Sequence, residues 1–323
     1  MLKTQVSFLL LAVVLTLFYC APQNEKFTPQ DHPLISAHTS SLISRTSPIR
    51  IVFVNNIADS SALNQAVTPS PLSFSPKING TCVWAQRNVL EFRPDGWLPR
   101  NTEYTATLKL AKLTEILQGE DSFRFQFSTL APSMDIRIDG LQTHGQDLSQ
   151  QIITGTLELA DTENPRNVEA VLSAQQENES LPITWNHVNP RTHHFTIENI
   201  TRHEDSSQVN LEWNGSAIDL NERGERKIII PGQSTFTLMS ARAVYGQQQY
   251  IELRFSDPLQ QTQTLQGLIR VPDHTNLNFS IEGNIVRVYS PQRFSGDITI
   301  NIEPGIRNSA GFRFDETAER TVT

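Results

Sequence analysis

From residue 48 onward, apolar and polar residues alternate in short runs, which Pro, Gly, Asn and Asp residues separate. Alternation with a period of two is typical of a strand that buries one face, whereas an amphipathic helix repeats its apolar residues every three or four positions. We find no helical periodicity long enough for the crossover helices of a parallel sheet. The clearest alternating runs are residues 49–53, 104–108, 123–127, 209–213, 251–255 and 298–302. The pattern predicts an all-β protein made of β-sandwiches.

The beginning and the end of this patterned region resemble each other, and the matching segments occur in the same order at similar spacing. The pairs are 50–54 with 252–255, 72–75 with 277–280, 88–94 with 284–291, and a Phe-Arg-Phe triplet at 123–125 with another at 312–314. Such self-similarity predicts two copies of one sandwich on either side of a middle unit. Chance similarity between two β-rich stretches is the alternative.

The chain therefore divides into five predicted units. The segment before the first strand is rich in Ser, Thr, Pro and Gln and lacks apolar periodicity, as expected of a flexible tether. The strands of the middle unit are fainter, at 152–159, 168–172, 194–200 and 208–213. The units are a signal peptide at 1–20, a tether at 21–47 and three tandem sandwiches at 48–130, 131–232 and 233–323.

The first twenty residues predict export from the cytoplasm. Lys3 is followed by an apolar run of about fourteen residues, which suits a signal peptide and is short for a membrane span. The run ends at Tyr19 and Cys20, and this ending resembles the lipobox of bacterial lipoproteins, in which the cysteine is lipidated. A bulky Tyr19 departs from the small residue of that pattern. We expect lipidation of Cys20 and anchoring to a bacterial membrane, in the periplasm or at the surface; an ordinary signal peptide with an incidental Cys20 is the alternative.

Composition excludes several classes of protein. Lys and Arg number 26 against 34 Asp and Glu, without a basic cluster, which argues against nucleic-acid binding. Two cysteines are too few for a disulfide framework or a zinc ribbon. Cys82, between Thr81 and Val83 in a predicted strand, is expected to be a buried and inert thiol.

Several motifs resemble the N-terminal region of bacterial alpha-2-macroglobulin-like lipoproteins. In the first sandwich they are Phe74-Ser75-Pro76, Gly80, Trp84, the run from Leu90 to Pro94 and the corner from Leu98 to Tyr104; in the third they are Phe255-Ser256-Asp257-Pro258-Leu259, residues 265–269 and residues 283–289. The resemblance implies a bacterial Ig-like domain followed by macroglobulin-like sandwiches, and a protein that traps proteases in the cell envelope. The Cys-Gly-Glu-Gln thioester of covalently acting members is absent from this sequence.

The functional expectation is therefore a non-enzymatic, membrane-anchored, anchor-proximal portion of such a protease-inhibiting or envelope-defence protein. Proteases would be partners only of a full-length protein. A cell-surface adhesion or glycan-binding protein is the alternative, because tandem sandwiches also serve as stalks and binding units.

Side chains capable of chemistry are present, but their spacing does not favour a site. His187, His193, His194 and His203 lie close in sequence, yet adjacent His193 and His194 would point to opposite faces of a strand, so surface or half-buried roles are expected. The acidic pairs Glu204-Asp205 and Glu222 with Glu225 are expected in solvated loops. No nucleophile elbow or phosphate loop is found. We predict no catalytic residue, no cofactor and no metal site.

Overall fold

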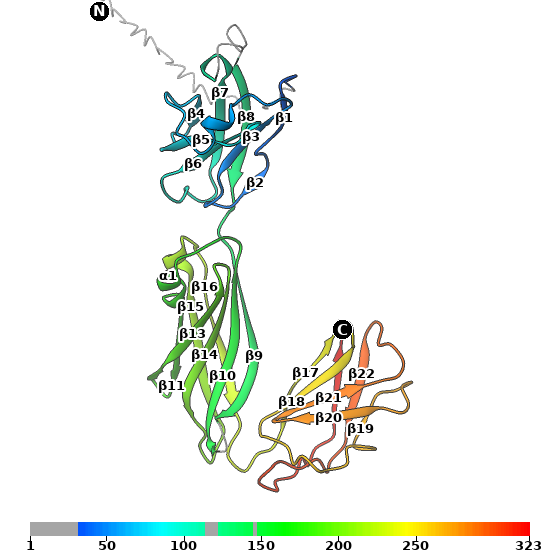
Figure 1. Ribbon diagram of the computed structural model, residues 1–323. Helices are drawn as coiled ribbons and strands as arrows, with labels where there is room; N and C mark the ends of the chain where they lie inside the picture. Colours follow the sequence, from blue (N-terminus) through cyan, green and yellow to red (C-terminus); the bar gives the residue numbers. More distant parts are fainter. Residues whose placement is uncertain (1–31, 114–121, 145–146) are drawn as a thin grey trace, which may run out of the picture.

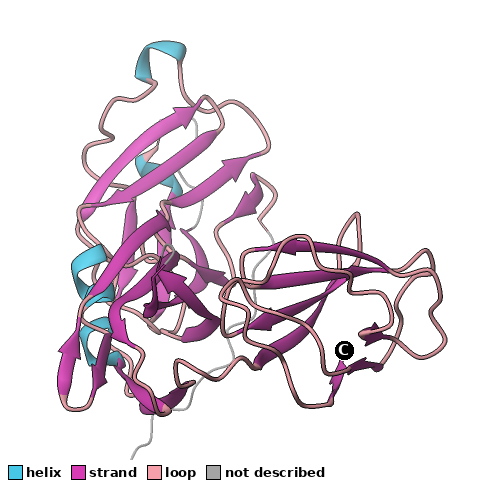
Figure 2. Cartoon of the chain, turned by 90° about the horizontal axis from the view of Figure 1, so that it is seen from below, coloured by secondary structure: helices cyan, strands magenta, loops and turns pink. Residues whose placement is uncertain are grey.

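The computed structural model describes residues 32–113, 122–144 and 147–323. The described chain is all-β and folds into three β-sandwiches, each with its own cluster of buried apolar side chains (Figure 1). We call them modules 1, 2 and 3; their buried clusters run from Ile49 to Phe127, from Leu141 to Ile230 and from Phe236 to Val322. Tandem β-sandwiches were predicted, and this fold class is confirmed. Module 3 projects sideways from the other two (Figures 1 and 2).

Module 1 packs two four-stranded sheets face to face. Its strands alternate as expected: Ile49, Ile51 and Phe53 point into the core from one strand, and Phe123, Phe125 and Phe127 point into it from the opposite sheet. One sheet has the order β1 (Ile35–His38), β3 (Ile49–Phe53), β6 (Val89–Pro94), β5 (Gly80–Gln86), and the other has β2 (Leu42–Ile43), β8 (Ser122–Thr129), β7 (Glu103–Lys109), β4 (Leu72–Ser75). Short 3-10 turns span Ser60–Ala62 and Leu110–Lys112.

The predicted tether at 21–47 is wrong for its second half. β1 pairs antiparallel with β3, and β2 pairs parallel with β8, so both belong to module 1. As edge strands they bury few side chains, which is why their sequence carries no clear apolar alternation. Residues 21–31 lie outside the described part of the chain.

Module 2 also packs two four-stranded sheets, which bear out the sandwich predicted for the middle unit. The first has the order β13 (Ile183–Asn189), β14 (Thr192–Thr201), β10 (Asp147–Leu159), β9 (Met134–His144); the second has β12 (Glu179–Leu181), β11 (Leu172–Gln176), β15 (Ser207–Asn214), β16 (Arg223–Ile230). A 3-10 turn spans Gly215–Ile218.

A short helix replaces one strand that the sequence predicted in module 2. Helix α1 spans Pro165–Glu169, so the prediction of a strand at 168–172 is wrong for its first residues. The Asn164 side chain accepts a hydrogen bond from the Arg166 N–H, and Pro165 stands at the first helical position, where its missing N–H costs nothing. These start signals outweigh the apolar alternation that follows them. No helix in the described ranges is long and apolar enough to cross a membrane.

Module 3 repeats the strand order of module 1. The sheet β17 (Leu238–Val244), β18 (Tyr250–Phe255), β21 (Ile285–Tyr289), β20 (Asn278–Glu282) corresponds to β1-β3-β6-β5, and the sheet β19 (Ile269–Arg270), β22 (Ile298–Ile302), β23 (Ala318–Val322) corresponds to β4-β7-β8. Asn88 exchanges hydrogen bonds with the backbone of Phe53, and Asn284 does the same with Phe255. These equivalent contacts support the predicted repeat.

Two of the proposed sequence matches are nevertheless wrong. Residues 72–75 form β4, whose counterpart is β19, whereas residues 278–280 lie in β20, the counterpart of β5. The triplet at 123–125 lies in β8, whose counterpart β23 begins only after the triplet at 312–314. Short alternating motifs recur in many strands, so only the matches with equivalent hydrogen bonds identify equivalent positions.

Candidate functional site at the module junctions

The residues singled out for chemistry do not converge. Cys20, the expected lipidation site, lies outside the described residues. Cys82 is 1% exposed, and burial raises the pKa of its thiol to about 12, as expected of an inert thiol. The described residues contain no group of three or more His, Cys, Asp or Glu side chains that could hold a metal ion. Glu204 and Asp205 are exposed; Glu225 is also exposed but lies in β16 rather than in a loop.

Two of the histidines do meet. His187 Nδ1 lies 2.8 Å from His193 Nδ1, and His187 Nε2 lies 3.1 Å from the Glu169 carboxylate. His193 is fully buried, which corrects the expected surface or half-buried role, while His194 is exposed on the opposite face of β14 as predicted. Burial, together with the neighbouring His187, lowers the pKa of His193. The pair is a structural contact of module 2.

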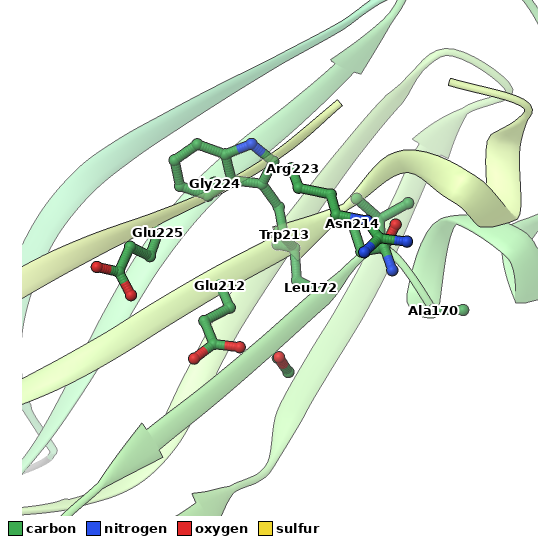
Figure 3. A pocket seen from close by; sticks show the side chains of 10 residues that line it. Ala170, Leu172, Glu212, Trp213, Asn214, Arg223, Gly224 and Glu225 are labelled. Atoms are coloured by element: carbon green, nitrogen blue, oxygen red, sulfur yellow. The ribbon is translucent and has the colours of Figure 1, made fainter. Parts of the chain in front are cut away.

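An open groove of about 660 Å³ lies beside edge strand β16 (Figure 3). The Trp213 ring covers Gly224 of that strand, where an added Cβ would lie 2.3 Å from the indole. Glu212 and Glu225 stand opposite each other across β15 and β16. Alternation places Glu212 on the other face of β15 from Trp213, so the ring and the two carboxylates do not converge. The groove therefore lacks a catalytic arrangement.

The charged side chains that do converge lie where modules 1 and 2 meet. Asp161 of module 2 is 2% exposed, and its carboxylate accepts hydrogen bonds from Ser44 Oγ at 2.5 Å and from the Arg45 backbone N–H at 2.8 Å. Glu163 pairs with Arg100 of module 1, and Arg45 Nη1 lies 3.7 Å from the same carboxylate. Two carboxylates of module 2 are thus enclosed by donors of module 1.

The carboxylates are held on the module 2 side as well. Glu163 Oε1 accepts hydrogen bonds from the Asn164 N–H at 2.7 Å and from Asn167 Nδ2 at 2.9 Å, both at the start of α1. Asp161 Oδ1 accepts from the Thr162 N–H at 2.8 Å. Because hydrogen bonds within module 2 already hold both carboxylates in place, the carboxylates offer module 1 a defined set of acceptors.

The junction between modules 2 and 3 is built around Arg202. This side chain is 0% exposed and forms an ion pair with Asp257 of module 3, which is also 0% exposed. Arg202 Nε donates to the Pro231 carbonyl at 2.9 Å, and Nη2 donates to the carbonyls of Gly232 at 2.8 Å and Thr235 at 2.7 Å. The guanidinium therefore binds the connecting segment 231–235 and module 3 at once.

A bulge in β9 brings the end of module 2 onto module 3. The register of β9 against β10 shifts beside Gly140, whose φ of 138° suits glycine, and the Arg254 side chain of module 3 occupies the space where a Cβ would lie. Beyond the bulge, the Leu141 carbonyl accepts a hydrogen bond from Asn284 Nδ2 at 3.0 Å. Gln151 Nε2 donates to the Ser256 carbonyl at 3.3 Å. Backbone and side-chain contacts thus fix this junction from several directions.

Sequence reasoning missed these junction residues. No sequence motif includes Asp161, Glu163 or Arg202, and Asp257 occurs only in the segment that resembles a known family. The partners are far apart in the chain: 55 residues separate Arg202 from Asp257. No local signal marks them, because none of the four lies near the predicted unit boundaries at 130/131 and 232/233.

Comparisons with known proteins agree with the fold. Residues 21–129 match the bacterial Ig-like domain family, so module 1 is similar to a bacterial Ig-like domain. No curated protein matches the sequence. Similar solved structures include domains 4–9 of surface layer protein SbsC (8% identity, 89% of this chain and 47% of that one, TM-score 0.33) and a titin fragment (6%, 90% and 96%, 0.29).

An L,D-transpeptidase from Mycobacterium tuberculosis is also similar, with 15% identity over 48% of this chain and 59% of that one and a TM-score of 0.23. This chain thus spans less than two thirds of the transpeptidase and of the SbsC fragment.

Proposed function

We propose that this chain is a non-enzymatic spacer of the bacterial cell envelope, which holds three sandwiches in a fixed arrangement and so positions module 3 relative to an N-terminal membrane anchor. One observation carries the proposal: both junctions are closed by buried charged side chains with partners on each side. Domains joined in tandem ordinarily move relative to each other unless their interface holds them.

Buried charges are a strong restraint on such motion. A sliding or tilting movement that keeps the junction closed would leave the Arg202 and Asp257 charges buried without their partner, and a buried charge without a partner is strongly unfavourable. The same holds for Asp161 and Glu163 at the other junction. An apolar interface, in contrast, could slide without losing a specific partner.

In its finer form, the proposal includes lipidation of Cys20 and a role as the anchor-proximal part of an alpha-2-macroglobulin-like protein that traps proteases. The sequence of residues 1–20 and the segment from Phe255 to Leu259 support this form. Protease capture would then belong to the whole protein, and the present modules would set its distance and orientation at the membrane.

Distance measurements between modules 1 and 3 test the spacer. Spin labels at Lys109→Cys and Glu319→Cys, both exposed, would be attached in a Cys20→Ser background; Cys82 is buried and should not react. We expect one narrow distance distribution by pulsed electron paramagnetic resonance. A broad distribution, like that of freely jointed domains, would contradict a fixed array.

A further inference from the structure

A polar groove lies at the end of module 3 that faces away from module 2. Two loops form it: the β17–β18 hairpin, with Gly246 and Gln247 to Gln249, and the segment from Tyr289 to Arg293 after β21. β18 begins at this end with Tyr250 and finishes at Phe255, two residues before Asp257 at the junction with module 2, so the groove and the junction lie at opposite ends of the strand. The groove encloses about 480 Å³. Loops at the end of an Ig-like sandwich are common positions for binding residues.

Aromatic rings stand beside the groove and are held in place. Tyr250 and Tyr289 lie on the outer face of the sheet with ring centres 5.5 Å apart. The Arg287 guanidinium carbon lies 5.5 Å from the centre of the Tyr250 ring. Arg287 Nη2 in turn lies 2.9 Å from Glu282 Oε2, and this ion pair holds the guanidinium in place. Tyr245, the first residue after β17, is 49% exposed. The Tyr250 and Tyr289 rings are therefore ordered before any ligand arrives.

Three side-chain amides of the groove are free to bind, whereas Gln249 Oε1 accepts a hydrogen bond from the Phe294 N–H and Ser290 Oγ is hydrogen-bonded to His274. Gln247, Gln248 and Gln292 are exposed, and their side-chain amides make no hydrogen bond with another described residue. Each amide offers a donor and an acceptor side by side. Arg293 is the one charged side chain among the described residues that line the groove. The chemistry is that of a largely neutral ligand with many hydroxyl groups and apolar faces.

We infer that this groove binds a neutral oligosaccharide. Adjacent hydroxyls of a pyranose ring can both donate to and accept from one amide, and its C–H face can stack on a tyrosine ring. This site goes beyond the spacer function: the junctions fix the orientation of module 3, and the groove at its far end would bind the saccharide.

A second module docking on this end is the competing interpretation. The β21–β22 loop corresponds to the β6–β7 loop of module 1, which meets module 2 through the Arg100 ion pairs and Trp97. The module 3 loops present unpaired amides and tyrosines instead of paired charges. This difference favours a sugar over a protein partner.

Titration with defined trisaccharides tests the inference on the full chain with Cys20→Ser. The probes are triacetylchitotriose, cellotriose and maltotriose, which separate an N-acetylated β-linked chain from β- and α-linked glucose chains. We expect at least one to bind at millimolar concentration or below, with amide NMR shifts concentrated at residues 245–250 and 289–293.

Tyr245→Ala should lower the affinity about tenfold, as expected for the loss of one aromatic contact. Gln247→Ala with Gln248→Ala gives a second variant that leaves the aromatic rings intact and should also weaken binding. Phe312→Ala, which removes an aromatic side chain that is 42% exposed elsewhere in module 3, should bind like the parent chain.

The inference is overturned if none of the three probes binds, if the shifts map outside the groove, or if the groove instead mediates association of the chain with a second copy. Because these experiments do not depend on inter-module distances, they can fail while the spacer proposal stands.

Discussion

Asp257→Asn should release module 3 from module 2. Asn keeps the shape of the side chain and one acceptor oxygen but removes the negative charge that faces Arg202. As long as the modules stay docked, the guanidinium would be buried without a counter-charge, held only by the Pro231, Gly232 and Thr235 carbonyls. The substitution therefore tests the charge of the junction with little change in packing.

Removing one partner of a buried ion pair costs about 3–5 kcal/mol. Because three hydrogen bonds from Arg202 to carbonyls survive, we expect the loss of docking free energy to lie near the lower value, about 3 kcal/mol. That energy corresponds to a shift of roughly a hundredfold in the equilibrium between docked and undocked modules. The ratio of undocked to docked chains should therefore rise by about that factor in the variant.

The spin-labelled chain described above provides the assay. We expect the narrow distance distribution to broaden in Asp257→Asn and to be unchanged in Asp315→Asn, whose carboxylate is in module 3 and 79% exposed. Urea unfolding adds an independent measure: the four tryptophans lie at positions 84, 97, 185 and 213, so fluorescence reports modules 1 and 2 while circular dichroism also reports module 3. The two unfolding curves should separate further in the variant.

Arg202→Gln combined with Asp257→Asn removes both charges and should restore part of the lost coupling, because no uncompensated charge remains. If Asp257→Asn leaves both the distance distribution and the unfolding curves unchanged, the ion pair does not hold the junction and the spacer argument loses its main support.

Three further predictions concern other parts of the chain. Gly224→Ala should destabilise module 2 by about 1–3 kcal/mol in urea unfolding, because the new Cβ would lie 2.3 Å from the Trp213 ring; Gly96→Ala, with nothing within 4 Å, should not, and equal effects would refute the contact. Folding lowers the pKa of His193, so the unfolded chain binds a proton at a higher pH than the folded chain, and the free energy of unfolding should fall as the pH drops below about 6.5. His193→Gln should flatten this pH dependence, and an unaltered pH profile in the variant would argue against a role of His193. Cys20→Ser should abolish labelling by a clickable fatty acid in the native host, and equal labelling of both chains would reject lipidation.

The sequence predicts the strands of this protein better than it predicts the boundaries of its modules. Residues such as Ile49, Ile51 and Phe53 alternate because one face of each central strand is buried, and that face can be read along the chain. Edge strands β1 and β2 bury little and carry no such pattern, so their residues resemble a linker. Burial, rather than strand formation itself, is what leaves a readable signal.

The junctions could not be predicted for a different reason. An isolated Arg or Asp beside a strand end is ordinarily solvated, and nothing local distinguishes Arg202 from an exposed arginine. Its burial depends on Asp257 and on the path of residues 231–235, which only the folded chain brings together. The Tyr-Gly-Gln-Gln-Gln-Tyr hairpin of the groove, in contrast, is visible in the sequence at 245–250 as a glycine-tipped loop between two tyrosines.

The internal repeat shows how one sandwich serves two positions in the array. The equivalence of Phe53 with Phe255 aligns Val54 and Asn55 of module 1 with Ser256 and Asp257 of module 3. Val54 is 56% exposed and Asn55 is also exposed, whereas both module 3 residues are fully buried against module 2.

Asn88 and Asn284 keep the same internal hydrogen bond, but only Asn284 also donates to Leu141 of the neighbouring module. The shared contact maintains the fold in both copies, and the changes at two adjacent positions, to a small polar residue and a carboxylate, convert an open end into a docking surface. Exchanging Ser256-Asp257 for Val-Asn should therefore leave module 3 folded but undocked, a result that circular dichroism and the distance measurement together would distinguish from simple unfolding.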